Sequence, residues 1–253
     1  MYRTIKWKLR EHSDLVRFGF MHNLLTDFIS KRYRKASYNT WLEIPYKHTI
    51  SKGFVFSENT PANALREIFV EEIYNIKGFT PAYGEVVVDA GANYGDSAIW
   101  WSRTFKAKVI AFEPLSEVFK VLEENIRLNK AEVTTYNVAL GNGSLISGSS
   151  DGNMLSAGGD LTMKAEKLDS YIFDRVDLLK IDVEGFEFDV LKGAENTISR
   201  FKPRIIIETH SKELRKKCHE FLSAHGYILK VEGRTVASKA KGMDKVTNLF
   251  YSV

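Results

Sequence analysis

The sequence predicts an α/β protein in which a mostly parallel β-sheet carries helices on both of its faces. From residue 85 onward, short apolar segments rich in β-branched residues alternate with amphipathic segments of helical period. The apolar segments are nearly continuous, as is typical of parallel strands covered on both faces. The last two strand-like segments, residues 227–232 and 248–253, have no helix between them. We therefore expect them to form an antiparallel pair at an edge of the sheet.

The remaining elements follow in order along the chain. Strands are expected at residues 85–90, 108–113, 133–140, 178–183 and 204–209, and helices at residues 96–105, 116–129, 187–201 and 211–224. Each helical segment repeats its apolar residues every three or four positions, and Gly226 stops the last helix. Trp100 and Trp101 are expected in the core. Upstream, the pattern predicts a short strand at residues 53–56 and a helix at residues 61–77 that begins at Pro61.

One interval, residues 141–167, shows no clear period and is rich in glycine and serine. It is long for a connection inside a compact domain, so we expect an irregular loop. Such loops commonly act as lids or substrate-binding segments, but a tolerated surface insertion would look the same. The sequence does not separate these two interpretations.

The composition is that of an ordinary globular protein, with 253 residues, 44% hydrophobic and 27% charged. This excludes disordered, collagen-like and disulfide-scaffold chains. Cys218 is the single cysteine, which excludes an internal disulfide and a multi-cysteine zinc site. No apolar run reaches the roughly 18 residues of a membrane span. The basic N-terminus lacks the apolar core of a secretory signal, so we expect a cytoplasmic protein.

Positive charge is concentrated near the N-terminus. The net charge is +4, yet residues 1–50 hold ten Lys or Arg against four Asp or Glu. We expect residues 1–60 to form a basic, mainly helical extension and residues 61–253 to form the main domain. The extension could attract phosphate-rich partners or an anionic membrane surface, or it could be a solvated flank. Its apolar residues between 15 and 29 could dock on the domain or on a second subunit, and the oligomeric state stays open.

The strongest motif is the loop VVVDAGANYGDS at residues 86–97, where a buried strand ends and a helix begins. Gly91 can adopt positive φ and lets a ligand approach the backbone, and Gly95 allows close packing of the following helix. The helix N-terminus would lie at the carboxyl edge of the sheet, where open α/β folds bind ligands. Asn93 stands between the two glycines, which are four residues apart. The glycine pattern of nicotinamide dehydrogenases is therefore not met.

A second signal follows at the end of the next strand. Glu113 lies 24 residues after Asp89 and precedes Pro114. A carboxylate in this position can accept hydrogen bonds from both hydroxyls of a ribose. Together the loop and Glu113 predict a nucleotide-like ligand, whereas the two glycines alone would be equally consistent with a plain turn.

Further segments continue this pattern, namely VIAFEPLSEVFKVLEENIRLN, YNVALGN, KAEKLDSYIF, LLKIDVEGFEFDVLKGAE and IIIETH. With the loop, they resemble the FkbM family of S-adenosylmethionine-dependent methyltransferases over about residues 83–210. The most specific pieces are D-x-G-A-N-x-G, F-E-P and K-I-D-V-E-G. The resemblance implies a Rossmann-like, seven-stranded class I methyltransferase sheet with an antiparallel last strand. It also implies methyl transfer from S-adenosylmethionine to a hydroxyl of a small molecule such as a sugar or secondary metabolite.

The resemblance also assigns roles to residues of this chain. Four residues of the loop would surround the methionine part of the cofactor: Asp89, Gly91, Asn93 and Gly95. Glu113 would hold the ribose, and three residues at the end of the third strand would lie near adenine: Asn137, Val138 and Ala139. Asp182, at the end of the fourth strand, would face the transferred methyl group.

Candidate catalytic side chains follow the fourth and fifth strands. Asp182 and Glu184 could orient or deprotonate a hydroxyl, and His210 could act as a base because imidazole titrates near neutral pH. Glu208 could orient His210 or face the core. Structural roles are the alternative: Asp182 or His210 could cap a helix, and Glu184 could bind local backbone. These four residues could hold a divalent ion, but no dedicated metal motif is present, so we expect a reaction without metal.

Other functions are also compatible with the sequence. An RNA methyltransferase could use the basic N-terminal region to bind phosphates, although no aromatic-rich RNA-binding module is apparent. A nucleotide-binding protein without catalysis would show the same loop, and binding of S-adenosylhomocysteine but not NAD would exclude a dehydrogenase.

Overall fold

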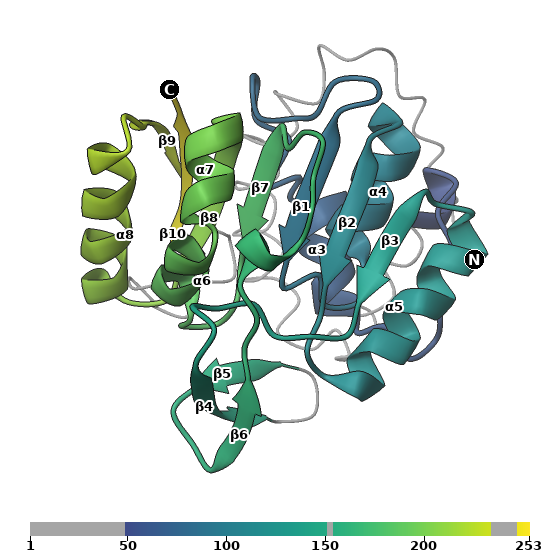
Figure 1. Cartoon of the computed structure of the whole chain (residues 1–253). Coiled ribbons are helices and arrows are strands. Elements are labelled where there is room, and N and C mark those ends of the chain that lie inside the picture. The colour runs from purple at the N-terminus through teal and green to yellow at the C-terminus, as the bar shows by residue number, and fades with distance from the viewer. Residues whose placement is uncertain (1–48, 151–153, 234–246) are drawn as a thin grey trace, which may run out of the picture. The chain divides into compact units, whose positions relative to one another are not determined.

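A seven-stranded sheet with the order β3-β2-β1-β7-β8-β10-β9 forms the centre of the described chain (Figure 1). The structure is a computed structural model that describes residues 49–150, 154–233 and 247–253. The sequence-based hypotheses about residues 1–48 therefore lie outside the described residues. The strands, in sheet order, are Val133–Tyr136 (β3), Lys108–Phe112 (β2), Val86–Ala90 (β1), Leu178–Ile181 (β7), Arg204–Thr209 (β8), Thr247–Ser252 (β10) and Ile228–Gly233 (β9).

The strand directions confirm the predicted parallel sheet with an antiparallel last strand. β1 pairs in parallel with β2 and β7, and β2–β3 and β7–β8 are also parallel. β10 is antiparallel to both of its neighbours, β8 and β9. The last strand of the chain is therefore inserted between β8 and β9, and β9 forms the edge.

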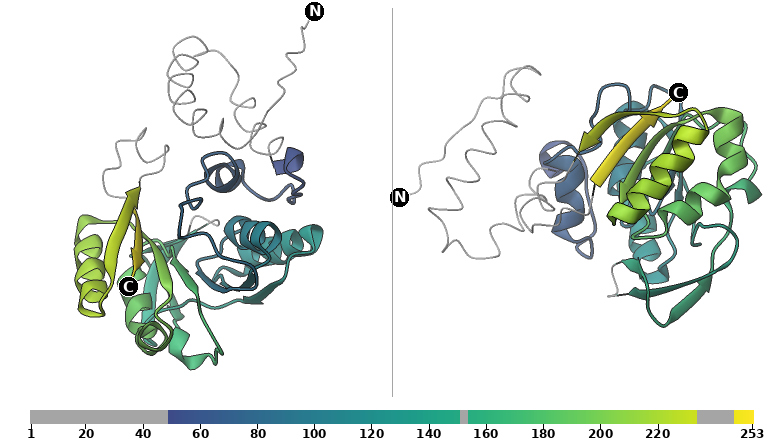
Figure 2. Two further views of the ribbon diagram at one scale, coloured as in Figure 1. Left: turned by 90° about the horizontal axis from the view of Figure 1, so that it is seen from above. Right: turned by 90° about the vertical axis from the view of Figure 1, so that its left-hand side faces the viewer.

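Helices cover both faces of the sheet, as Figure 2 shows from two sides. Val87 and Val88 are consecutive in β1 and point into two different cores because side chains alternate across a strand. One core is formed with α3 (Ala62–Phe69), α4 (Asp96–Phe105) and α5 (Ser116–Asn129), and the other with α6 (Glu187–Gly193), α7 (Glu195–Phe201) and α8 (Lys212–Ala224).

Buried side chains agree with the amphipathic pattern. Trp100 and Trp101 both lie in the core between α3, α4 and the sheet, as predicted. Cys218 of α8 is fully buried in the opposite core. Burial raises the pKa of its thiol to about 12, with the charges of Glu187 and Asp189 adding to the effect.

Two predicted helices are shorter than the apolar pattern suggested. The segment expected as one helix at residues 187–201 is divided into α6 and α7 at Ala194, whose φ of −113° and ψ of 9° are not helical. A Cβ on the neighbouring Gly193 would lie 1.8 Å from the carbonyl oxygen of Gly141, so the chain passes very close here. α3 ends at Phe69, and Glu72 then adopts a left-handed φ of 51°, which stops the predicted continuation to residue 77.

The strand expected at residues 53–56 is absent from the described structure. Asn129 of α5 accepts the N–H of Val55 and donates to its carbonyl oxygen, at 3.0 and 2.5 Å. Asn125 likewise accepts the N–H of Ser57 at 2.7 Å. Side-chain amides on one helix therefore satisfy backbone groups that a neighbouring strand would otherwise have paired.

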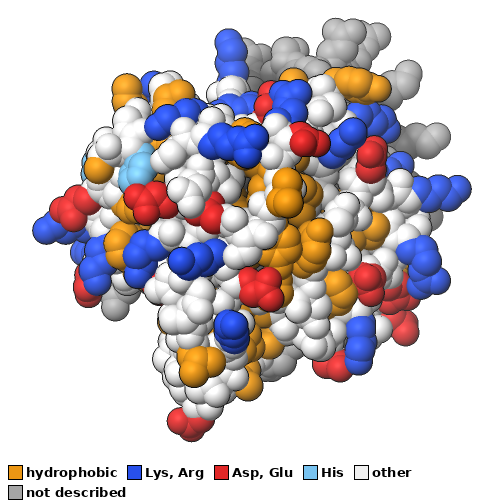
Figure 3. Space-filling view, in the orientation of Figure 1, with side chains coloured by type: hydrophobic (Ala, Val, Ile, Leu, Met, Phe, Trp, Pro, Cys, Tyr) orange, Lys and Arg blue, Asp and Glu red, His pale blue; other side chains and the backbone are white. Residues whose placement is uncertain are grey.

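The interval expected to be irregular, residues 141–167, instead contains a small antiparallel sheet of order β5-β4-β6. Its strands are Leu145–Ser150 (β4), Leu155–Ala157 (β5) and Leu161–Lys164 (β6), and we call residues 145–164 the flap. Ile146 and Leu155 are buried with Phe186 in a separate core, which supplies the apolar face that a sheet needs. Hydrophobic side chains also lie on the surface in this region (Figure 3). Leu145 of β4 is 73% exposed.

Candidate active site

The turn after β1 lies directly against the end of β7. Gly91 has a φ of 79°, and a Cβ on it would lie 1.8 Å from the carbonyl oxygen of Asp182. Gly95 begins α4 with a φ of 84°, and its Cβ would lie 2.4 Å from Leu122 of α5. Both positions therefore require glycine for conformation and for space. Asn93 also has positive φ, at 48°, which asparagine tolerates better than most residues.

Glu113 follows β2 and is anchored by backbone donors on two sides. The N–H of Asn93 donates to Oε2 at 3.0 Å, and the N–H of Leu115 donates to Oε1 at 2.9 Å. Burial raises the pKa of the carboxyl group to about 7, although the two N–H donors act to lower it. Glu113 is 6% exposed and lines the cavity described below. It stands where the sequence placed it, beside the turn after β1.

The three residues expected near adenine have different environments. Val138 and Ala139 line the cavity. The side-chain amide of Asn137 instead donates to the carbonyl oxygens of Glu113 and Pro114, at 2.8 and 3.0 Å. Asn137 therefore joins the chain after β3 to the chain after β2.

Asp89 is fully buried beneath the turn rather than at the cavity wall. The hydroxyl of Ser97 donates to its Oδ2 at 2.6 Å, and Nζ of Lys180 lies 3.0 Å from its Oδ1. Burial raises the pKa of Asp89, and the charge of Lys180 and the Ser97 hydrogen bond oppose this shift. Asp89 thus fixes the start of α4 to the strands below it.

Lys180 is a cation that the sequence reasoning did not identify as part of the site. It lies in the middle of β7, donates to the carbonyl oxygen of Gly91 at 2.6 Å and stands 3.7 Å from Oδ2 of Asp182. Its pKa is raised, because the charges of Asp89 and Asp182 outweigh the opposing effect of burial. The available signal was a lone charge within the apolar run of β7.

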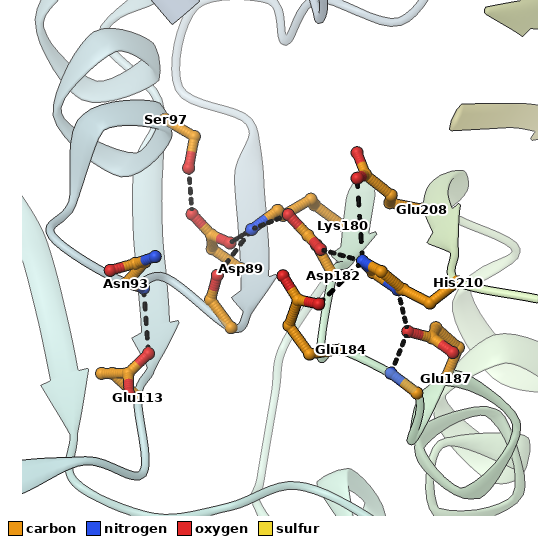
Figure 4. Close-up of polar contacts among 12 residues, drawn as sticks. Asp89, Asn93, Ser97, Glu113, Lys180, Asp182, Glu184, Glu187, Glu208 and His210 are labelled. Atoms are coloured by element: carbon orange, nitrogen blue, oxygen red, sulfur yellow. Dashed lines mark hydrogen bonds and ion pairs between the residues drawn. The ribbon is translucent and has the colours of Figure 1, made fainter. Parts of the chain in front are cut away.

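The ends of β7 and β8 bring three predicted carboxylates around the imidazole of His210, which was also predicted (Figure 4). Nδ1 of His210 lies 2.7 Å from Oε1 of Glu187, and Nε2 lies 3.2 Å from Oε2 of Glu184. The same Nε2 is 3.7 Å from Oε1 of Glu208 and 3.9 Å from Oδ1 of Asp182. α6 has no side-chain cap, so Asp182 does not serve as one. Glu187, at the start of α6, is a further member that the sequence reasoning missed.

Negative charge exceeds positive charge in this group. Burial alone would lower the pKa of His210, but the hydrogen bond with Glu187 and the charges of Asp182, Glu187 and Glu184 raise it to about 10. Burial, followed by the charge of Asp182, raises the pKa of Glu208 well above its usual value. Several carboxylates therefore surround one imidazole and favour its protonated form.

Two more acidic residues extend the group across the cavity. Glu67 comes from α3, and burial with neighbouring carboxylates raises its pKa to about 8. Asp96 comes from the first turn of α4, and burial raises its pKa to about 7 while the charge of Lys180 opposes the shift. Asp96 lies within the loop motif of residues 86–97 but was given no role from the sequence, and Glu67 is far from the motifs along the chain.

The candidate residues described above line a cavity of about 440 Å³, except for Asp89, Gly95, Asn137 and Glu187. The cavity lies at the carboxyl ends of β1, β2, β7 and β8, and Met154 and Leu155 of the flap complete its wall. This is the edge at which open α/β sheets bind ligands. None of the described helices has the length and apolar composition to span a membrane.

The strand order, the antiparallel last strand and the cavity at this edge define a class I methyltransferase fold. The fold and the site therefore place the protein in the class of methyltransferase enzymes. The family model of the methyltransferase FkbM domain matches residues 89–229, and the chain belongs to this family.

The chain is also similar to individual proteins, among them the following three. Hexuronic acid methyltransferase AglP of Haloferax volcanii is 32% identical over an alignment of 143 residues, and the match covers 50% of this chain and 56% of AglP. AMB antimetabolite synthetase AmbE of Pseudomonas aeruginosa is 28% identical over 226 residues, covering 68% of this chain and 10% of AmbE. The crystal structure of methyltransferase FkbM from Methylobacillus flagellatus has a TM-score of 0.53 at 18% identity, covering 84% of this chain and 58% of that one. This chain therefore spans less than two thirds of each of the three.

Proposed function

We propose that this methyltransferase uses S-adenosylmethionine and methylates a hydroxyl group of a small molecule. The observation that carries the proposal is the position of Glu113, a buried carboxylate that is fixed by two backbone N–H groups at the cavity wall. Each carboxylate oxygen has two acceptor sites, so Glu113 retains capacity for ribose hydroxyls.

The chain fits the cofactor along the same wall. Gly91 presents bare backbone to the cavity, where any side chain would collide with the end of β7. Asn93 continues this surface beside the expected amino-acid part of the cofactor, whereas Gly95 does not line the cavity and instead starts α4. Val138 and Ala139 offer an apolar surface for adenine. When bound, S-adenosylmethionine supplies a methyl group on a positively charged sulfur, so the protein has mainly to position the reactants and exclude water.

The acceptor hydroxyl would lie at the ends of β7 and β8. In our proposal Asp182 and His210 orient it, and Oε2 of Glu184 accepts the proton that it releases. The cavity has the size of a small-molecule site rather than that of a groove for a polymer. AglP, by its name, acts on a hexuronic acid, which supports a hydroxyl-rich acceptor.

Replacing Glu113 by alanine tests the cofactor assignment. We expect a loss of about 1.5–3 kcal/mol in the binding of S-adenosylhomocysteine, the range for hydrogen bonds to a charged group. Isothermal titration calorimetry measures this loss directly. Glu117→Ala is the matched control, because Glu117 is an exposed carboxylate on α5. Equal affinities of Glu113→Ala and the unmodified protein would contradict the proposal.

A further inference from the structure

We propose that Asp182, Glu208 and His210 form a binding site for a divalent metal ion at the carboxyl ends of β7 and β8. The three side chains offer two carboxylate oxygens and one imidazole nitrogen. These donor atoms all lie within 4.8 Å of one another. Such a set is suited to first-row divalent ions such as Mn²⁺ or Zn²⁺.

The distances are close to those around a bound ion. Nε2 of His210 is 3.7 Å from Oε1 of Glu208 and 3.9 Å from Oδ1 of Asp182. Nitrogen and oxygen ligands lie about 2.0–2.2 Å from a metal such as zinc, so two ligands of one ion are separated by roughly 3–4.4 Å. Small movements of flexible side chains would therefore bring all three atoms into coordination.

Glu187 supplies the orientation that a metal-binding histidine needs. Its Oε1 is 2.7 Å from Nδ1 of His210 and accepts the backbone N–H of Gly185 at the same distance. Glu187 is fully buried, so this carboxylate is held in place. When the single proton of a neutral imidazole is on Nδ1 and points to Glu187, Nε2 is unprotonated. Nε2 then faces Asp182 and Glu208 and can bind a metal ion, as in carboxylate–histidine–metal sites.

Glu208 gives an independent indication of a missing positive partner. It is 8% exposed, and its Oε2 has no hydrogen-bond partner in the described structure. The residue nevertheless lines the cavity. A buried carboxylate oxygen without a partner is costly, and a bound cation would satisfy it.

The charges of the cavity wall favour a cation at this position. The described wall contains six carboxylates but only two cationic residues, Lys180 and His210. Lys180 is occupied by Asp89 and the carbonyl oxygen of Gly91. A divalent ion would balance the remaining carboxylates. It would also bind the oxygen of the acceptor hydroxyl, so that Asp182 and His210 would orient the hydroxyl through the ion. This role rests on the proposed function, whereas metal binding itself does not.

Titration with Mn²⁺ tests the site. Protein freed of metal with a chelator is titrated while electron paramagnetic resonance follows the free ion. We expect one Mn²⁺ per chain, with a modulation signal from a directly bound nitrogen that disappears in His210→Gln. Glu208→Gln should weaken binding by about 10–100-fold, and so should Glu187→Gln, which alters the partner of Nδ1 of His210. Glu117→Gln, which alters an exposed carboxylate, should leave it unchanged.

Binding of S-adenosylhomocysteine by each variant separates the possible outcomes. Retained binding shows that the variant is folded and that the cofactor assignment stands on its own. A protein that binds S-adenosylhomocysteine but shows no saturable Mn²⁺ binding would overturn the metal site alone. Mn²⁺ binding with equal affinity in the unmodified protein and in Glu208→Gln, or without a nitrogen signal, would overturn the assignment to these residues.

Discussion

At the scale of single residues, Glu113 shows how the fold prepares an acceptor for hydroxyl groups. Its carboxylate is removed from water, yet two backbone N–H groups are directed at it. Burial raises its pKa to about 7, and the nearby charges of Lys180 and Asp89 act in opposite directions. The ionised form is the stronger acceptor of hydrogen bonds. Cofactor affinity should therefore depend on pH near neutrality.

We expect the affinity for S-adenosylhomocysteine to be constant above pH 7 and to fall as the pH decreases below it. Below its raised pKa, Glu113 of the free protein carries a proton. Binding of S-adenosylhomocysteine to the ionised carboxylate must release this proton, so the affinity falls as the pH decreases. The loss is at most about tenfold per pH unit. Calorimetry between pH 5.5 and 8.5 measures it. The profile should be flatter in Glu113→Gln, and an identical profile there would assign the titration to another group.

Lys180 illustrates a charge whose main role is structural. It is buried between Asp89 and Asp182 and also binds the backbone of Gly91. Removing one partner of a buried pair leaves the other charge without compensation, and this is far more costly than removing both.

Lys180→Met should therefore lower the free energy of unfolding by about 3–5 kcal/mol. The double variant Asp89→Asn/Lys180→Met should recover part of the loss, because no buried charge is then left unpaired at that position. Denaturant unfolding of the two variants provides the comparison. A double variant as unstable as the sum of the two single variants would show that the residues do not act as a pair.

The site residues that could be predicted from the sequence belong to short motifs, each at the end of a strand. Gly91, Glu113 and Asp182 belong to this group, because strand ends in a parallel sheet meet at one edge. Lys180 and Glu67 were missed because their roles depend on packing between elements. The proposed metal ligands were named from the sequence as possible ligands, but no metal was expected, because they come from two strands and only the sheet brings Asp182 beside His210.

At the scale of elements, the regular parts of the fold were predictable and the exceptions have local causes. α4 and α5 have the expected bounds because their apolar faces are continuous. The division between α6 and α7 depends on the close approach of Gly193 to Gly141, which no periodicity reveals. The flap escaped prediction because its short strands alternate buried and exposed residues among many glycines and serines.

The flap is held to the domain by a small core of its own. Leu155 packs there with Phe186 and Ile146, apart from the two main cores, and the N–H of Ala157 donates to the carbonyl oxygen of Glu184. Its opening should therefore occur without unfolding of the central sheet.

Replacing Leu155 by alanine should loosen the flap selectively. Leucine-to-alanine changes in a core cost about 2–5 kcal/mol, which corresponds to at least a tenfold faster exchange of amide hydrogens in β4 and β5. Exchange in β1 and β7 should change much less. Hydrogen–deuterium exchange with mass spectrometry measures both regions in one experiment. Equal acceleration in the flap and the sheet would show that they unfold together.

At the scale of the whole molecule, the cavity belongs to one compact unit that extends from Pro45 to Val253. All described residues that line the cavity lie between Pro61 and His210. The described lining of the proposed cofactor site therefore lies within this unit.

A chain that begins at Pro45 should bind S-adenosylhomocysteine with an affinity within about twofold of that of the full chain, because the unit contains its own cores. Calorimetry on both chains tests this expectation. If the full chain binds RNA in a salt-dependent manner, the shorter chain should lose that binding, because its most basic segment has been removed. A large loss of S-adenosylhomocysteine affinity would instead assign residues 1–44 a part in the site.

The position of Cys218 has a practical consequence. The chain contains no other cysteine, and this thiol is fully buried with a raised pKa, so it should react slowly with alkylating reagents. A cysteine introduced on the flap by Leu145→Cys would then be the first thiol to take up a fluorescent or paramagnetic label. Movements of the flap during a catalytic cycle could be followed in this way without first removing the native cysteine.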